Sequence, residues 1–218
     1  MARVARVLTF LALLLALVAT QSPSEATLGD DQPGGGGDTS AQPGKLRAQM
    51  TFTKNHAHPW RSTLTWDAAR QRGDGSWKVL AHDSWRAGSG LPGRRTENPC
   101  VKGHGWLPNG TYSLRHYPDY HGNLIHGRAF RLDDKRCPNG TLREQLFIHT
   151  EAGAGNTQCA NVPGDQLCRW EYPQINDYTS HGCIKMSPAD LLALTRDYHR
   201  FFHSRVRYST ARVRLVVR

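Results

Sequence analysis

The segment 178–186, Tyr-Thr-Ser-His-Gly-Cys-Ile-Lys-Met, places a cysteine where its thiol could act as a nucleophile. Cys183 lies just before a predicted helix N-terminus, where backbone N–H groups and the helix dipole favour a negative charge. If the segment is extended, His181, Cys183 and Lys185 point to one face, so two cationic neighbours would flank the sulfur. Because an unperturbed cysteine is mostly protonated at neutral pH, this environment predicts an activated thiol rather than a passively buried one.

A cysteine nucleophile also needs a base, and His149 and His181 are both candidates on spacing alone. Strand alternation puts Phe147 and His149 on one face, and a glycine-containing loop at 152–155 follows, so His149 is well placed to face a cleft. A base must reach the thiol proton at about 2.6 to 3.2 Å, and a neighbour on the same short turn rarely aligns so well. We therefore expect His149 to be the base and to give cysteine alkylation a near-neutral pKa.

The elements that must position these residues are mostly strands. A hairpin turn is predicted at 73–75, and one helix is predicted after the cap Ser187, with Pro188 at its first position. Extended segments separated by Gly, Pro and Asn are expected at 46–53, 62–67, 77–83, 107–112 (a turn entering a strand), 127–132, 144–150 and 212–218. The sequence predicts a mostly β domain, sandwich-like or barrel-like, with one late α-helix.

The first 44 residues predict export followed by a tether. An apolar run at 7–19 follows Arg3 and Arg6, is too short to span a bilayer, and precedes small residues at 24 and 26 that suit cleavage. We expect a signal peptide over 1–26, with a short retained membrane anchor as the alternative. Residues 27–44, rich in Gly and Pro, predict a flexible linker, and 45–218 form the folded domain.

The folded domain is strongly basic. The chain carries a formal net charge of +10, and because two arginines and four acidic residues precede Lys45, residues 45–218 carry +12. An exported domain of this charge should associate with a polyanion, and composition does not choose among an anionic cell wall, a membrane surface and nucleic acid. Export also allows cysteines to pair, and five cysteines leave one over.

The chain resembles L,D-transpeptidase catalytic domains of the YkuD type, bacterial enzymes that cross-link peptidoglycan. The resemblance rests on Ile148-His149 followed by Ser-His-Gly-Cys-Ile-Lys-Met at 180–186, with the turn at 107–112 and the helix-then-strand ending in support. It covers residues 100–218, and 45–99 only in outline. It implies that Cys183 is the nucleophile and that His149 is the base.

The same resemblance implies roles for the residues around these two. The backbone carbonyl of Thr150 would orient the base, and Ser180, His181 and Gly182 would shape the site. Backbone N–H groups near Gly182 and Cys183 would form the oxyanion hole. No metal or cofactor is expected, because acyl transfer by a thiolate and an oxyanion hole is self-sufficient.

Three features differ from the usual family pattern and bear on substrate affinity. The stretch between His149 and Ser180 is longer, Thr150 stands where glycine or serine is commoner, and Lys185 stands where arginine is usual. We expect Thr150, Lys185 and Trp170 to contact the substrate. The longer stretch contains two cysteines that could staple it into a compact lid.

If Cys183 stays a free thiol, four cysteines remain and three pairings are possible. The pairing that keeps each loop local joins Cys100 with Cys137 and Cys159 with Cys168. We expect this pairing.

The resemblance implies a secreted or wall-associated enzyme, expected to be a monomer, that acts on peptidoglycan stem peptides. Cys183 would attack the amide between the third and fourth stem residues, and an amine on a neighbouring stem would resolve the thioester into a 3→3 cross-link. The partners would be stem peptides and the anionic wall rather than nucleic acid, with no membrane span in the mature form. The alternatives are an L,D-carboxypeptidase with the same site, a non-catalytic wall-binding domain, and a sortase-like enzyme, which would need a downstream site arginine.

The remaining histidines and most tryptophans are expected to have structural rather than catalytic roles. No metal-ligand spacing is found among the six histidines expected at the surface, which are His56, His58, His104, His116, His121 and His126. Most tryptophans are expected in the core, while Trp106 and Trp170 flank loops of the predicted cleft.

Overall fold

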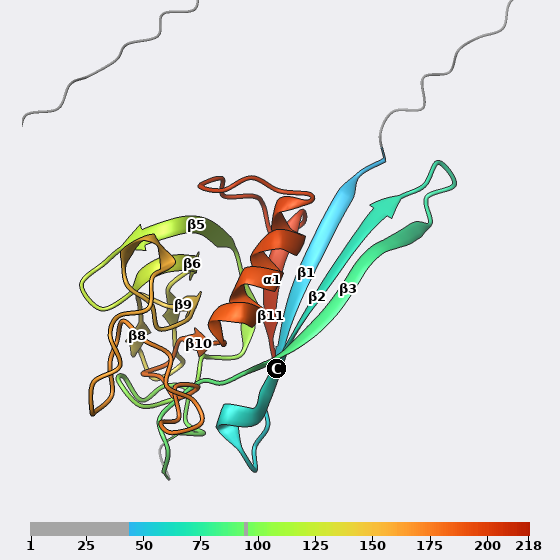
Figure 1. The fold of residues 1–218 in the computed structure, drawn as a ribbon. Helices are drawn as coiled ribbons and strands as arrows, with labels where there is room; N and C mark the ends of the chain where they lie inside the picture. The colour runs from blue at the N-terminus through green and yellow to red at the C-terminus, as the bar shows by residue number, and fades with distance from the viewer. Residues whose placement is uncertain (1–43, 94–95) are drawn as a thin grey trace, which may run out of the picture. The chain divides into compact units, whose positions relative to one another are not determined.

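A computed structural model describes residues 44–93 and 96–218 (Figure 1). The expected signal peptide (1–26), and all of the expected linker except Gly44, lie outside the described residues. The elements are β1 (Leu46–Thr53), η1 (Pro59–Arg61), β2 (Ser62–Gln71), β3 (Trp77–Ala87), β4 (Gly110–Tyr112), β5 (Leu114–His121), β6 (His126–Leu132), β7 (Lys135–Arg136), β8 (Leu142–Arg143), β9 (Phe147–His149), η2 (Ala154–Asn156), β10 (Ile184–Lys185), α1 (Pro188–His199) and β11 (Val213–Val217). The prediction of a mostly β domain with one late helix is confirmed.

A five-stranded sheet has the order β3-β2-β1-β11-β4. β1 pairs antiparallel with β2 and parallel with β11, and alternate residues of these strands are buried on one face. This alternation is typical of a sheet that covers a core with one side only. β2 and β3 extend to Gln71 and Ala87, beyond the predicted ends, and the turn between them contains Gly75 at a φ of +83°.

A second sheet has the order β10-β9-β6-β5, and β7 and β8 form a separate pair. β5 was not predicted; it contains Pro118, and its pairing with β6 is irregular between Tyr117 and Tyr120. An edge strand tolerates proline at such a bulge, which explains why its composition did not indicate a strand. β9 is shorter than the predicted strand 144–150, because Gln145, with a φ of +54°, interrupts the extended chain.

Helix α1 lies between the two sheets (Figure 1). The Tyr198 ring centroid is 6.1 Å from that of Trp66 on β2 and 5.2 Å from that of Phe130 on β6, so one helical side chain contacts both sheets. The helix and residues of both sheets share one hydrophobic core. The helix begins as predicted, with Ser187 Oγ accepting a hydrogen bond from the Asp190 N–H at 3.1 Å. None of the helices in the described ranges is long and apolar enough to cross a membrane.

His116 is buried, so the expectation of a surface position is wrong for this histidine. The centroid of its ring lies 4.7 Å from that of Phe130 and 5.6 Å from that of Tyr198 on α1. Burial, with smaller contributions from His199 and Arg128, lowers the pKa of His116 to about 3. The imidazole is therefore a neutral core side chain at physiological pH.

Candidate active site

The predicted base lies on β9, and the predicted nucleophile immediately precedes the adjacent parallel strand β10. β9 pairs with β10 in a register that sets Ile184 beside Ile148 and Lys185 beside His149. The Cys183 sulfur lies at the start of β9, 3.7 Å from the Gln145 carbonyl oxygen and hydrogen-bonded by the Phe147 N–H. Two residues rise about 7 Å along a strand. The Cys183 thiol therefore lies beside the first residues of β9, whereas His149 is the last residue of that strand.

His149 is held in a single tautomer. Its Nδ1 lies 2.9 Å from the backbone oxygen of Thr150, and because a carbonyl only accepts, Nδ1 carries the proton and Nε2 keeps a lone pair. Burial, reinforced by the charge of Lys185, lowers the pKa of His149 to about 3. The ring is thus a neutral imidazole. It is oriented by the Thr150 carbonyl, the group to which the family resemblance assigned this role.

The surroundings of Cys183 favour the protonated thiol in the resting protein. Burial raises the pKa of Cys183 to about 11, outweighing the opposite effects of the Phe147 N–H, Lys185 and Arg143. The expected help from the helix N-terminus is absent because β10 and the cap Ser187 separate the thiol from α1. The sulfur is therefore a thiol at neutral pH, and the expected near-neutral ionisation is not supported.

We predict that alkylation of Cys183 by iodoacetamide accelerates about tenfold for each pH unit between pH 7 and pH 10, because the thiolate fraction grows by that factor below a pKa of about 11. The same chain in urea is the control, and its rate should level off near the ordinary cysteine pKa of about 8.5. Peptide mapping without reductant identifies the alkylated residue. A native rate that levels off below pH 8 would contradict this prediction.

His181 and Lys185 do not flank the sulfur as an extended segment would require. Residues 181–183 form a bend, and the exposed His181 places Nδ1 2.6 Å from the Gly103 oxygen. The Lys185 ammonium pairs with Glu151 instead. Burial raises the pKa of Glu151 to about 7, although Lys185 opposes the shift. Lys185 thus acts on Cys183 only through its charge.

The side chain of Ser180 organises the turn before the nucleophile. Its hydroxyl donates to the Cys183 oxygen at 2.6 Å and accepts from the N–H groups of Gly182 at 3.2 Å and Gly90 at 3.3 Å. The Gly182 N–H is thus paired with Ser180 in this structure, and the expected oxyanion hole stays a prediction. Backbone hydrogen bonds between Gly88 and Lys185, at 3.0 and 2.9 Å, hold the other edge of β10.

Arg143 is a site residue that the sequence analysis missed. It is 2% exposed, and its guanidinium donates to the backbone oxygens of Pro99, Gly105, Trp106 and His181. Its charge lowers the pKa of Cys183. A Cβ on Gly182 would lie 2.0 Å from Arg143 Nη2, and Gly182 has a φ of +124°, so only glycine fits there. No motif marks Arg143, since it lies forty residues before Cys183 in a two-residue strand.

We predict that Arg143→Met slows alkylation of Cys183 at pH 8 about tenfold relative to Arg143→Lys, because a nearby cation lowers an acid's pKa by about one unit or more. Both variants lose guanidinium hydrogen bonds to backbone oxygens and should unfold at lower temperature, so their difference isolates the charge. Circular dichroism verifies the fold of each variant before the rates are compared. Equal alkylation rates for the two variants would show that the charge does not reach the thiol.

The disulfides of the structure are Cys100–Cys137 and Cys159–Cys168, the two pairs expected from the sequence. Among the described residues, Cys183 is the free cysteine. Cys159–Cys168 lies within the long segment between β9 and β10.

Thr150 and Trp170, which were expected to contact substrate, are less exposed to solvent than a substrate-contacting role predicts. The Thr150 hydroxyl is buried and has no hydrogen-bond partner in the described residues. Trp170 is half-buried, and its ring packs edge-on to Tyr178, with centroids 4.9 Å apart. Trp106 is 2% exposed, which excludes it as a stacking platform for a sugar.

Comparisons of this chain with family models, with curated proteins and with solved structures returned no match. The site combines a neutral imidazole of fixed tautomer, a thiol just before the adjacent strand, and a buried cation behind the nucleophile turn. These groups suit acyl transfer through a thioester.

Proposed function

We propose that this chain is a secreted cysteine acyltransferase of the L,D-transpeptidase type that forms 3→3 cross-links between peptidoglycan stem peptides. The observation that carries the proposal is the parallel pairing of β9 with β10, with His149 Nδ1 bound to the Thr150 oxygen. This arrangement leaves the Nε2 lone pair of His149 as the proton acceptor that the proposal assigns to Cys183, the free cysteine of the described residues.

In the first half-reaction, the proton of Cys183 passes to His149 Nε2 while the sulfur bonds to the stem carbonyl carbon. The C–N bond then breaks, and the departing amine of the terminal D-amino acid takes the proton from Nε2. Burial disfavours each charge formed alone, whereas a thiolate and an imidazolium formed together attract each other. Proton transfer is therefore expected when the substrate carbonyl is in place rather than in the resting protein.

In the second half-reaction, the amine of a neighbouring stem attacks the thioester carbonyl. A new C–N bond forms, the C–S bond breaks, and the sulfur regains a proton that the amine releases through His149. Arg143 supports both steps, because its charge favours negative charge on the sulfur and on the tetrahedral oxygen. All proton transfers use groups of the chain and of the two stems.

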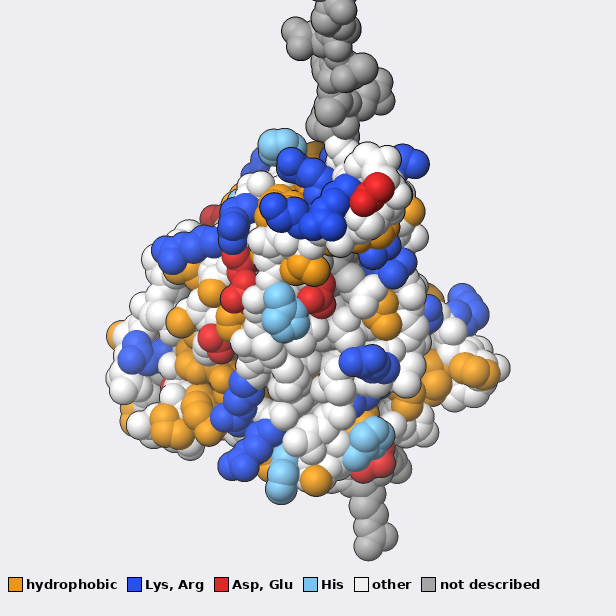
Figure 2. All heavy atoms as spheres, turned by 90° about the vertical axis from the view of Figure 1, so that its right-hand side faces the viewer, with side chains coloured by type: hydrophobic (Ala, Val, Ile, Leu, Met, Phe, Trp, Pro, Cys, Tyr) orange, Lys and Arg blue, Asp and Glu red, His pale blue; other side chains and the backbone are white. Residues whose placement is uncertain are grey.

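The basic surface suits an anionic wall. Lys45, Arg47, Arg70 and Arg212 line a groove of about 580 Å³ together with Trp77. Figure 2 shows Lys and Arg side chains spread over one face of the domain, with their densest group toward the end where the described chain begins. Such a surface raises the local concentration of a polyanionic substrate. Two disulfides agree with an extracellular location.

Incubating the purified protein with disaccharide tetrapeptide, followed by mass spectrometry of the products, tests the proposal. We expect a cross-linked dimer whose mass is two substrates minus one D-amino acid. Tripeptide monomer with released D-amino acid and no dimer would indicate the carboxypeptidase instead. Binding to wall sacculi with neither product, in a protein whose Cys183 still reacts with iodoacetamide, would favour the wall-binding domain and overturn the proposed enzyme.

A further inference from the structure

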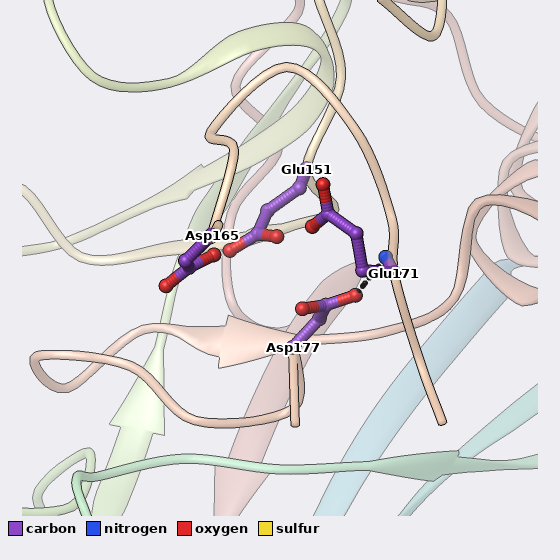
Figure 3. A group of neighbouring side chains, drawn as sticks. All are labelled: Glu151, Asp165, Glu171 and Asp177. Atoms are coloured by element: carbon purple, nitrogen blue, oxygen red, sulfur yellow. Dashed lines mark hydrogen bonds between the residues drawn. The ribbon is translucent and has the colours of Figure 1, made fainter. Parts of the chain in front are cut away.

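Four carboxylates converge beside the active site (Figure 3). Glu151 directly follows Thr150 after β9, Asp165 and Glu171 come from the long segment before β10, and Asp177 lies three residues before Ser180. One oxygen from each lies within 4.8 Å of the others. Glu151, Glu171 and Asp177 are 3%, 9% and 1% exposed, while Asp165 is exposed at the edge of the cluster.

One oxygen of each buried carboxylate already has donors. Glu151 Oε1 pairs with Lys185, Glu171 Oε1 accepts from Gln166 Nε2 at 2.9 Å, and Asp177 Oδ2 accepts backbone N–H groups of Glu171 and Tyr172. These contacts account for half of the buried oxygens. They also anchor each carboxylate, so that its second oxygen is held in a fixed direction.

The second oxygens are unpartnered. Glu151 Oε2, Glu171 Oε2 and Asp177 Oδ1 are buried and have no hydrogen-bond partner among the described residues. Among residues 44–93 and 96–218, Lys185 is the one cation paired with this cluster, and its ion pair is with Glu151. Three buried carboxyl groups thus share one paired ammonium and keep three unpartnered oxygens, for which a bound cation would be a partner.

We propose that Glu151, Asp165, Glu171 and Asp177 form a calcium-binding site. All the ligand atoms are carboxylate oxygens, which are the ligands of hard divalent cations. Four carboxylates gathered in one place suit Ca²⁺, whereas Mg²⁺ usually takes one or two carboxylates and keeps several waters. This site revises the expectation, drawn from the sequence alone, that the domain holds no metal.

Calcium at this position would join three parts of the chain that carry the active site. It would tie the end of β9, which bears His149, to the segment that leads into the Ser180–Cys183 turn. It would also hold the long segment in place, because the disulfide Cys159–Cys168 encloses Asp165. The proposal does not depend on the identity of the substrate, since its readouts are metal binding and stability.

The test uses the purified exported chain, freed of metal with a chelator and titrated with CaCl₂ by calorimetry and by thermal unfolding. We expect one ion per chain and a Tm about 5 to 10 °C higher at a calcium concentration 100 times the Kd. Asp165→Asn, at the exposed ligand, should weaken binding at least about tenfold while the chain still folds. Glu171→Gln should also raise the Tm of the chelated protein, because it removes one repelling charge.

Glu97→Gln, which changes an exposed carboxylate outside the cluster, is the matched control and should bind calcium like the wild type. Absence of calorimetric heat together with an unchanged Tm at about 10 mM CaCl₂, far above typical extracellular affinities, would overturn the site. Wild-type affinity in both Asp165→Asn and Glu171→Gln would overturn the ligand assignment. MgCl₂ that binds as tightly as CaCl₂ would overturn the choice of calcium.

Discussion

Replacing Cys183 with alanine or serine should lower cross-linking of tetrapeptide substrate by at least about 10³-fold and abolish the acyl-enzyme. Alanine has no nucleophile, and a serine hydroxyl is far harder to deprotonate in the buried setting that already raises the pKa of the thiol. Mass spectrometry of the intact protein, quenched with acid during turnover, should detect the thioester in the wild type only.

The control measurement for both Cys183 variants is their thermal stability. Because the Cys183 side chain is half-buried and its polar contacts are limited to the Gln145 oxygen and the Phe147 N–H, both variants should keep the Tm of the wild type within a few degrees. Continued formation of dimer by folded Cys183→Ala would show that the thiol does not carry the reaction.

Replacing His149 with alanine should lower kcat by about 10² to 10⁴-fold, the range typical of a general base. The Nδ1 contact with Thr150 leaves Nε2 as the only acceptor on the ring, so no other atom of this side chain can accept the proton. His181→Ala is the control. Because the His181 ring is exposed and bonded to the Gly103 oxygen, its removal should cost kcat less than about tenfold.

Steady-state kinetics of the two variants separate the roles. A base acts on the chemical step, so His149→Ala should change kcat far more than KM, and circular dichroism should show an unchanged fold. A larger kcat loss in His181→Ala than in His149→Ala would mean that His181 activates the thiol. The roles of the two histidines would then be reversed.

Much of this protein followed from local sequence pattern. Alternating apolar residues predicted β1 and β11, the Ser187-Pro188 cap predicted the start of α1, and the odd cysteine count singled out a free thiol. These features are local, because strand alternation, capping and a cysteine count each depend on neighbouring residues or on composition. For the same reason, Cys183 and His149 could be named as candidates before any contact between them was known.

Features that depend on distant segments were decided by the tertiary structure. Burial, which no local pattern measures, raises the pKa of Cys183 where the sequence predicted activation, and it encloses His116 where a surface position was expected. Arg143 lies behind the nucleophile turn only because β8 packs there, and its four backbone acceptors come from two remote segments. The four carboxylates likewise meet from separate parts of the chain. Sequence determined which groups could do chemistry, whereas packing determined their charge state and their neighbours, because both depend on contacts between residues far apart in the chain.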